Sequence, residues 1–350
     1  MLIINDFSNL VGGAERFLEN LLREPVTEHI HYYQVAIADL FPLQQGKPNR
    51  LSVSWKRIRI WKVIMKTLRE KISAIQPDVI HLNNNNLYTN SVAKSLKDVT
   101  IPIVYFLHDG YALKRLESLF YPKFRTTYLF ATHSPDIYDQ LVSTGKKAFL
   151  VKVPFNHSDW QTSSLKVDQD RKIDLLYVGR LEKGKGIFKL IEAVEKIKVV
   201  IPSISLTVLG DGSQRQSVLN RIKAKNLTGN IHLEGFQHDE DLRRYYNNAK
   251  LLVFPSEGES LGYVGLEAQS CGVPVITFDH QGARRWCRDY QNGFLVKGRS
   301  TQKLVDKVLE IINDDVLLTR ISTTAREHME FESYNASRQE LSGVFKALCP

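Results

Sequence analysis

Cysteine is scarce in this sequence, which contains three, Cys271, Cys287 and Cys349, among 350 residues. An odd and widely spaced set favours reduced thiols over a framework of disulfides. The sequence also lacks any run of the roughly 18 apolar residues that a membrane-spanning helix needs. Its first residues, MLIINDF, start on a strand-like run with no basic segment, so we expect no signal peptide. These absences favour a cytoplasmic protein.

The signatures of several other protein classes are missing too. No Gly-x-Ser-x-Gly motif points to a hydrolase. No Gly-x-Gly-x-x-Gly follows the first predicted strand, as it does in dinucleotide dehydrogenases. No spacing of His and Cys indicates zinc. The function therefore has to be sought in other parts of the sequence.

Basic residues outnumber acidic ones by 47 to 38, which gives a formal net charge of +9. Such an excess suits a nucleic acid, an anionic membrane surface or a phosphate-bearing ligand. The densest basic run is WKRIRIWKVIMKTLREKI at 55–72, where apolar residues recur at helical spacing. We interpret it as a helix that packs its apolar side on a sheet and exposes a basic face. The alternative is that this face also contacts anionic lipid headgroups.

Apolar runs alternate with helix-length patterns along most of the chain, which is long enough for two domains. Continuous rather than alternating apolarity is typical of parallel strands covered on both faces. We therefore predict an α/β fold of two Rossmann-like, doubly wound parallel-sheet domains facing each other across a cleft. The predicted strands are 2–6, 33–38, 78–82, 101–108, 128–133 and 149–154, then 172–179, 205–210, 231–235, 251–256 and 274–278. The predicted helices include 14–23, 56–75, 187–200, 213–225 and 301–312.

A polar stretch without periodicity, 156–172, separates the two sets of strands, and we interpret it as a linker. The predicted N-terminal domain is 1–158 and the predicted C-terminal domain is 171–332.

Glycine-rich turns follow predicted strands in both domains. VGGAE at 11–15 pairs Gly12 with Gly13, which would let the backbone come close to a ligand at the start of the next helix. LGDG at 209–212, which contains Gly210, forms a similar turn in the second domain. Such turns alone are weak evidence for a ligand site, because many glycine-rich turns are simply tight connections between a strand and a helix.

The turn YVGRLEKGKG at 177–186 is more informative. Its strand ends in Gly179, and Arg180 and Lys185 follow at the strand's carboxyl end, where open α/β sheets bind ligands. Two such cations suit a diphosphate, because arginine offers a planar fork and lysine a point charge.

The stretch PSEGESLGYVGLEAQSCGVPV at 255–275 contains three glutamates beside four glycines. Glu259 precedes a predicted helix, and Glu267 lies within it. Carboxylates accept hydrogen bonds well from paired hydroxyls, so the two glutamates would bracket the two sugar ends of a nucleotide diphosphate sugar. Backbone amides at the helix start would face the diphosphate between them. These amides belong to Leu261, Gly262, Tyr263 and Val264.

Taken in order, these segments resemble the family 4 retaining glycosyltransferases over nearly the whole chain. EGESLGYVGLEAQSCGVPV carries a Glu-x7-Glu motif like theirs, at Glu259 and Glu267. VGGAERFLENLL resembles their N-terminal glycine loop, VGRLEKGKG their diphosphate-binding loop, and FQHDEDLRRYYNNAKLLVFPS the segment before the motif. FESYNASRQELSGVFKAL resembles the closing segment that crosses back, so we join 333–350 to the N-terminal domain.

The resemblance implies a GT-B fold, sugar transfer with retention, and no metal or other cofactor. It implies that Glu267 holds the donor ribose and Glu259 the hydroxyls of the transferred sugar. Arg180 and Lys185 would hold the diphosphate leaving group. His108 in YFLHDGY matches a strand-end histidine expected near the transferred sugar.

The resemblance also places Gly12 and Gly13 near the donor phosphates or the acceptor. Several residues keep a purely structural alternative at this stage. Glu257 is better explained as a solvated neighbour than as a catalytic group, and His108 and His81 have alternative roles in stabilising turns. Two departures from the family stand out: VPFNHSDW at 153–160 lacks the usual Asn-Gly turn, and NNNN at 83–86 replaces a mixed polar stretch.

The implied activity is that of a hexosyltransferase in cell-surface polysaccharide or glycolipid biosynthesis. It would move a sugar from a UDP- or GDP-sugar to a glycan or lipid-linked acceptor, with no nucleic acid involved. The basic run at 55–72 would suit peripheral contact with the inner face of the membrane. The alternatives are an epimerase or hydrolase of nucleotide sugars with the same fold, and a non-catalytic protein that binds nucleotide sugars or glycans. The Asp-x-Asp at 168–170 resembles the metal site of another glycosyltransferase fold, but lies in the polar linker.

Overall fold

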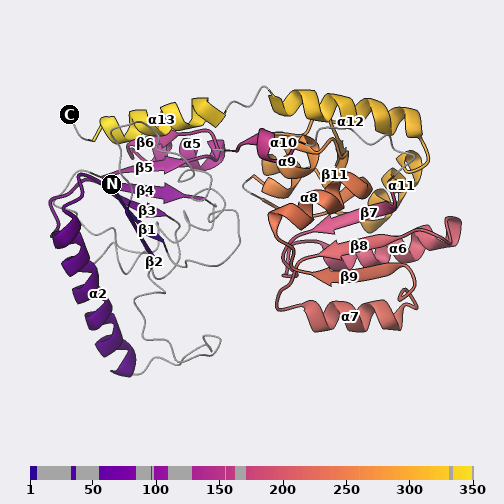
Figure 1. Cartoon of the computed structure of the whole chain (residues 1–350), viewed down its shortest axis with the longest axis horizontal. Coiled ribbons are helices and arrows are strands. Elements are labelled where there is room, and N and C mark those ends of the chain that lie inside the picture. The colour runs from indigo at the N-terminus through magenta and orange to yellow at the C-terminus, as the bar shows by residue number, and fades with distance from the viewer. Residues whose placement is uncertain are drawn as a thin grey trace. The chain divides into compact units, whose positions relative to one another are not determined.

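The computed structural model describes residues 1–5, 33–36, 55–83, 96, 98–108, 128–153, 155–161, 171–259, 261–330 and 334–348. The chain divides into two compact units, Met1–Phe155 with Tyr334–Pro350, and Asn156–Ser333. Each unit contains a six-stranded sheet (Figure 1), and every strand pairing in the described residues is parallel.

The sheet of the first unit has the order β2-β1-β3-β4-β5-β6. Its central strands β3 and β4 are buried at every position, and β4 is a continuous run of apolar and aromatic residues, whereas β3 also buries His81 and Asn83. The last strand is shorter than the run predicted at 149–154, although Val151 still donates to the carbonyl of Thr132 at 2.9 Å. The strands are β1 Leu2–Asn5, β2 Tyr33–Ala36, β3 Ile80–Asn83, β4 Ile103–Leu107, β5 Tyr128–Thr132 and β6 Ala148–Leu150.

Three helices of the first unit lie within the described residues: α2 Trp55–Ile75, α5 Pro135–Ser143 and α13 Tyr334–Lys346. The helix predicted at 56–75 is confirmed. It buries Ile64, Leu68 and Ile72, which recur every four residues, in the core cluster of the sheet. The C-terminal helix α13 is tied to the first unit, where Glu340 accepts a hydrogen bond at 2.8 Å from the amide of Lys152, two residues after β6.

The sheet of the second unit has the order β12-β11-β10-β7-β8-β9. The chain runs from β7 outward to β9 and then returns to the other side of β7, so the strand order reverses between β7 and β10. Ligands of open α/β sheets bind at such a switch point, outside the carboxyl ends of the strands. The strands are β7 Ile173–Val178, β8 Leu206–Leu209, β9 Ile231–Gly235, β10 Ala249–Phe254, β11 Val275–Phe278 and β12 Phe294–Val296.

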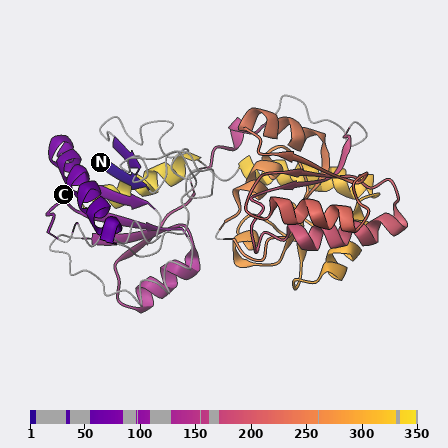
Figure 2. The ribbon, with the colours of Figure 1, turned by 90° about the horizontal axis from the view of Figure 1, so that it is seen from below.

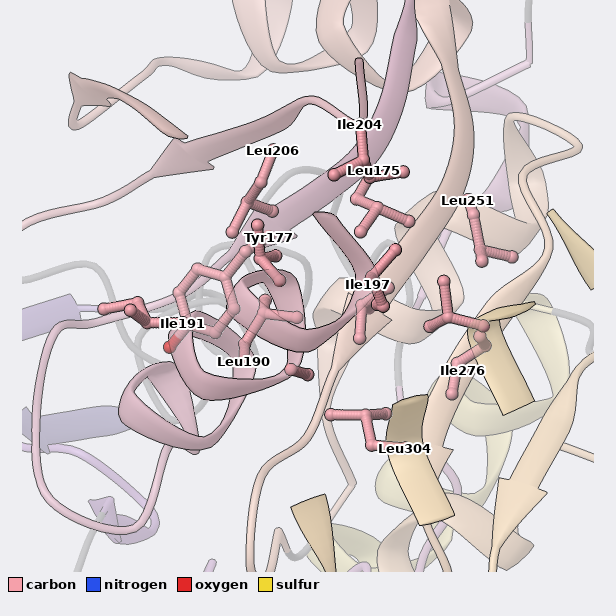
Figure 3. Packing of buried hydrophobic residues seen from close by; sticks show 14 of the residues in the cluster. Leu175, Tyr177, Leu190, Ile191, Ile197, Ile204, Leu206, Leu251, Ile276 and Leu304 are labelled. Carbon is pink, nitrogen blue, oxygen red and sulfur yellow. The ribbon is translucent and has the colours of Figure 1, made fainter. Parts of the chain in front are cut away.

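Helices flank both faces of this second sheet (Figure 2). Leu190 and Ile197 of one helix and Leu304 of another pack with Leu175 and Ile276 of the strands in one core cluster (Figure 3). Burying a leucine or isoleucine side chain contributes about 1.5–3 kcal/mol. The helices are α6 Ile187–Val200, α7 Arg215–Ala224, α8 Asp239–Asn248, α9 Tyr263–Ser270, α10 Gln281–Arg284, α11 Thr301–Ile311 and α12 Asp315–Glu330, with a 3-10 turn, η2, at His157–Asp159.

The first residues of the predicted linker pack on the second unit. Trp160 is buried, its ring meets that of Tyr246 edge-on with centroids 5.9 Å apart, and its carbonyl accepts from Cys271 Sγ at 3.1 Å. Residues 162–170, and the helix predicted at 14–23, lie outside the described residues. In the part of the chain that is described, no helix has both the length and the apolarity that crossing a membrane requires.

Candidate active site

Three adjacent strands of the second unit end where the sequence-predicted donor residues begin. β10 lies between β7 and β11, and Leu252 is in register with Leu176 on one side and Val275 on the other. Because the strands are parallel, their carboxyl ends meet at one edge of the sheet. The loops that start there carry Lys185 after β7 and Glu259 after β10.

The loop after β7 is held by Tyr177 and by a glycine. The buried Tyr177 hydroxyl lies 3.4 Å from the carbonyl of Arg180 and 3.3 Å from that of Lys185. Burial, and then the charge of Glu259, raise the pKa of Tyr177 well above its usual range, so the hydroxyl stays protonated. Gly186 has a φ of 78°, and a Cβ there would lie 1.9 Å from the Pro255 carbonyl oxygen. Only glycine fits this close approach of two loops.

Lys185, predicted to bind the diphosphate, and Glu259, predicted to bind the transferred sugar, contact each other. Lys185 Nζ lies 2.5 Å from Glu259 Oε1, and Ser256 Oγ donates to the same oxygen at 2.7 Å. The side chains of Lys185 and Glu259 are only 20% and 15% exposed. The pair therefore forms a largely enclosed, mutually neutralised site at the sheet edge.

A second ion pair lies beside the first. Lys189 Nζ lies 2.8 Å from Glu257 Oε1, and the hydrogen bond from Lys189 lowers the pKa of Glu257. The Glu257 amide also donates to the carbonyl of Gly184 at 2.8 Å. Glu257 is thus a partly exposed, paired residue that fastens its loop to the first turn of α6. Nothing in the sequence pattern identifies Lys189 as its partner.

Arg180 presents an exposed side chain at the same edge. Its guanidinium makes no hydrogen bond or ion pair with any residue in the described ranges. The pKa of the neighbouring Glu182 is lowered by hydrogen bonds from Ser213 and, to a smaller extent, by the charge of Arg180. A cation that is already solvated and not engaged is available to an anionic ligand.

The helix that follows Glu259 begins where the sequence predicts. Gly262, with a φ of 89°, is the N-cap of α9, and the first helical residues are Tyr263 and Val264. The indole of Trp286 donates to the carbonyl of Leu261 at 2.7 Å and so fixes the entry to the helix. N–H groups of a first helical turn point along the axis away from the helix, which suits an anion.

Glu267 lies on α9, in the second turn. It is 2% exposed, and the hydroxyl of Tyr246 on α8 donates to its Oε2 at 3.0 Å. The same hydroxyl lies 3.4 Å from the Val264 carbonyl. A buried carboxylate that is oriented in this way is a preorganised acceptor for hydroxyl groups.

Two of the predicted donor-binding glycines are explained by packing between loops. A Cβ on Gly210 would lie 2.0 Å from the Gly179 carbonyl oxygen, and the amide of Gly210 donates to the Gly235 carbonyl at 2.7 Å. The turns after β7 and β8 therefore approach backbone to backbone. Gly12 and Gly13 lie outside the described residues.

His108 belongs to the first unit, where it joins a buried polar cluster at the carboxyl ends of β3, β4 and β5. Its Nε2 lies 2.8 Å from Asn83 Oδ1, and its Nδ1 lies 3.3 Å from His133 Nε2. Burial lowers the pKa of His108 well below its usual range, and the charges of His133 and His81 act in the same direction. The ring is therefore neutral, and both of its nitrogens have protein partners.

His81 lies next to this cluster, on β3. It is fully buried, its ring faces those of Phe106 and Phe345, and burial lowers its pKa to about 3. Sequence reasoning missed His133, although it ends the predicted strand 128–133 just as His108 ends the predicted strand 101–108. Across the described ranges, no three side chains of His, Cys, Asp or Glu gather into a group able to hold a metal ion.

The chain belongs to the glycosyl transferases group 1 family, whose model matches residues 140–328. A Campylobacter jejuni relative, N-acetylgalactosamine-N,N'-diacetylbacillosaminyl-diphospho-undecaprenol 4-alpha-N-acetylgalactosaminyltransferase, is 24% identical over 94% of this chain and 95% of its own length. The Staphylococcus aureus capsular polysaccharide biosynthesis glycosyltransferase CapM is 32% identical over 44% of this chain. The match covers only 40% of the CapM sequence.

The fold is shared with solved structures along its whole length. The structure of Anabaena Alr3699/HepE in complex with UDP-glucose has a TM-score of 0.78, with 18% identity and 99% coverage of both chains. Two Rossmann-like domains of parallel strands define the GT-B architecture, so the predicted fold class is confirmed.

Proposed function

We propose that this chain is a retaining, metal-independent hexosyltransferase that uses a nucleotide diphosphate sugar as donor. The observation that carries the proposal is the pairing of Lys185 with Glu259 at the switch point of the second sheet. A cation for a diphosphate and a carboxylate for sugar hydroxyls lie there within one hydrogen bond of each other. The UDP-glucose complex of the HepE structure supports a UDP-sugar as donor, and a GDP-sugar has the same diphosphate chemistry.

Each assigned residue has a defined role in this reaction. Arg180 and Lys185 hold the diphosphate and stabilise the negative charge that develops as it leaves, the kind of term that usually dominates catalysis. Glu259 binds hydroxyls of the transferred sugar, and Glu267 binds the ribose. The amides at the start of α9 and the turns at Gly179 and Gly210 complete the donor site. His108 contributes from the first unit near the transferred sugar, and Gly12 and Gly13 approach the donor phosphates or the acceptor.

The acceptor hydroxyl attacks from the side on which the diphosphate departs, because no side chain is assigned as a nucleophile or general base. The departing diphosphate helps to take the acceptor's proton. Domain 171–332 binds the donor, and domain 1–158 with 333–350 binds the acceptor. The acceptor is a glycan or a lipid-linked glycan, as the diphospho-undecaprenol named for the C. jejuni relative suggests.

The exposed face of α2 gives this proposal a membrane component. Lys62, Lys66 and Arg69 are exposed on one face, and the buried Ile64, Leu68 and Ile72 lie on the other side of the helix. We assign this face to peripheral contact with anionic lipid at the inner face of the membrane, where a lipid-linked acceptor resides. The protein then works in cell-surface polysaccharide or glycolipid assembly.

The release of nucleoside diphosphate tests the function against its alternatives. Purified protein is incubated with UDP- and GDP-sugars, with and without undecaprenyl-diphosphate-linked sugar or a short glycan. Release that depends on the acceptor supports a transferase. Release without any acceptor identifies a hydrolase, and binding without release identifies a non-catalytic protein.

A further inference from the structure

His280, two residues after β11, has one ring nitrogen without a hydrogen-bond partner among the described residues. Its Nδ1 accepts from the amide of Ala283 at 3.2 Å and caps α10, whereas its Nε2 is buried and unpartnered. Since Nδ1 is an acceptor, a neutral ring carries its proton on Nε2. A buried N–H that lacks an acceptor is unfavourable. The position therefore suits a ligand atom that accepts a hydrogen bond.

The charges around the ring connect it to the donor site. Burial is the largest influence and lowers the pKa of His280, so the ring is neutral near pH 7. Glu259 and Asp279 oppose this shift, while Arg299 and Lys185 reinforce it. Lys185 and Arg180 already provide positive charge for a diphosphate. The neutral N–H of His280 is therefore better suited to an uncharged oxygen of the ligand.

Glu259 offers the complementary group. Its Oε1 accepts from both Lys185 and Ser256, while its Oε2 has no donor within the part of the chain that the structure describes. β10 and β11 are adjacent, with Phe254 in register with Thr277, so the loops that carry Glu259 and His280 start side by side. The carboxyl ends of these two strands thus hold a buried donor without a partner and a carboxylate oxygen to which no described residue donates.

We infer that His280 and Glu259 together recognise one hydroxyl of the transferred sugar. His280 Nε2–H donates a hydrogen bond to the hydroxyl oxygen, and Glu259 Oε2 accepts a hydrogen bond from the hydroxyl. A hydroxyl donates and accepts at once, whereas an acetamido carbonyl or a carboxylate only accepts. This rests on the proposed function and adds a specificity-determining residue to it. Because Nε2 is buried, donor binding has to displace a neighbouring side chain. We expect Lys185 to be the side chain that moves, because the diphosphate offers it a partner other than Glu259.

The test separates recognition of the sugar from recognition of the nucleotide. Binding of UDP, GDP and their glucose, galactose, xylose and N-acetylglucosamine derivatives is measured by calorimetry for the wild type and His280→Asn. Asparagine is a favoured N-cap, so this variant keeps the α10 cap and removes only the deeper donor. His280→Ser provides a second variant of the same design. His238→Asn, at the exposed N-cap of α8, is the matched control.

We expect His280→Asn to bind the nucleoside diphosphate within twofold of wild type and the preferred nucleotide sugar about tenfold more weakly. The sugar derivative that lacks or inverts the recognised hydroxyl should bind wild type and variant alike. Equal changes for nucleotide and nucleotide sugar, or no change in either, would overturn the inference while leaving the proposed function intact. If the wild type binds none of these ligands, the proposed function fails and this inference fails with it.

Discussion

Lys185 Nζ lies 2.5 Å from Glu259 Oε1, so the group that we assign to the diphosphate and the group that we assign to the transferred sugar hold each other. A diphosphate offers Lys185 a stronger partner, and sugar hydroxyls offer Glu259 several donors. Donor binding therefore adds partners to both groups. Within the pair, neither group is left as an uncompensated, partly buried charge.

Replacing Lys185 with alanine should lower turnover by about 10²–10³-fold, as loss of one stabilising group for a developing anion does in other enzymes. Donor affinity should fall much less, because the lysine acts mainly on the charge that appears during departure. Steady-state rates and calorimetry measure the two effects. Lys189→Ala is the control, since it removes a lysine one helical turn away that pairs with Glu257. Near-normal turnover of the Lys185 variant would refute the assignment.

Replacing Glu267 with glutamine should weaken nucleotide binding by about tenfold, because a neutral amide accepts less strongly from ribose hydroxyls than a carboxylate. UDP and GDP themselves, without a sugar, are sufficient ligands for this measurement. Tyr246→Phe should show a smaller loss of the same kind, since it removes the 3.0 Å hydrogen bond that orients the carboxylate. Unchanged nucleotide affinity in Glu267→Gln would place the ribose elsewhere.

Two glycines in one loop allow the effect of backbone strain on stability to be distinguished from the effect of a steric clash. Gly184 and Gly186 have φ values of 84° and 78°, but only at Gly186 would a Cβ meet backbone, 1.9 Å from the Pro255 carbonyl oxygen. Gly184→Ala should lower the free energy of unfolding by about 1–2 kcal/mol through the left-handed conformation alone. Gly186→Ala should lower it considerably more, and should also weaken nucleotide binding. Urea unfolding measures the loss of stability in each variant, and equal losses would contradict the close contact between the two loops.

Acid should destabilise the first unit through His81. Its folded pKa is about 3, whereas a histidine in an unfolded chain titrates near 6.5. The unfolded state therefore binds more protons between these values, so stability is complete above about pH 6.5 and falls as pH decreases toward 3. At pH 4.5 the loss is roughly 2–3 kcal/mol, because each pKa unit corresponds to 1.36 kcal/mol.

His81→Leu should remove this part of the pH dependence, since leucine fills a similar volume and does not titrate. His232→Leu, at an exposed strand position, is the control and should leave the acid sensitivity unchanged. Thermal unfolding at pH 7.5 and pH 4.5 measures the difference for each variant. An unaltered pH dependence in His81→Leu would contradict the assignment to this residue.

Periodicity and turn residues were sufficient to predict most of the fold. The helix predicted at 187–200 coincides with α6, and α9 begins within the predicted stretch 261–264. These predictions succeed because apolar spacing and glycine conformation act locally along the chain. The strand β12 was missed because three residues are too few to show a pattern.

Partnerships between side chains of different loops could not be predicted in the same way. The Lys189–Glu257 pair joins residues 68 positions apart, and the two ring nitrogens of His280 differ only in their surroundings. Such contacts depend on which strand ends are adjacent, and adjacency follows from sheet order rather than from local sequence. The motif identified the groups, whereas the structure shows how they are paired with each other.

Calorimetric titration of the purified protein with UDP-, GDP- and related sugars, alongside Lys185→Ala and Glu267→Ala, tests the central claim most directly. The account predicts that one nucleotide sugar binds selectively to the wild type and that Glu267→Ala weakens this binding more than Lys185→Ala does. If no nucleotide sugar binds, or if both variants bind like the wild type, then the edge formed by β7, β10 and β11 is not a donor site.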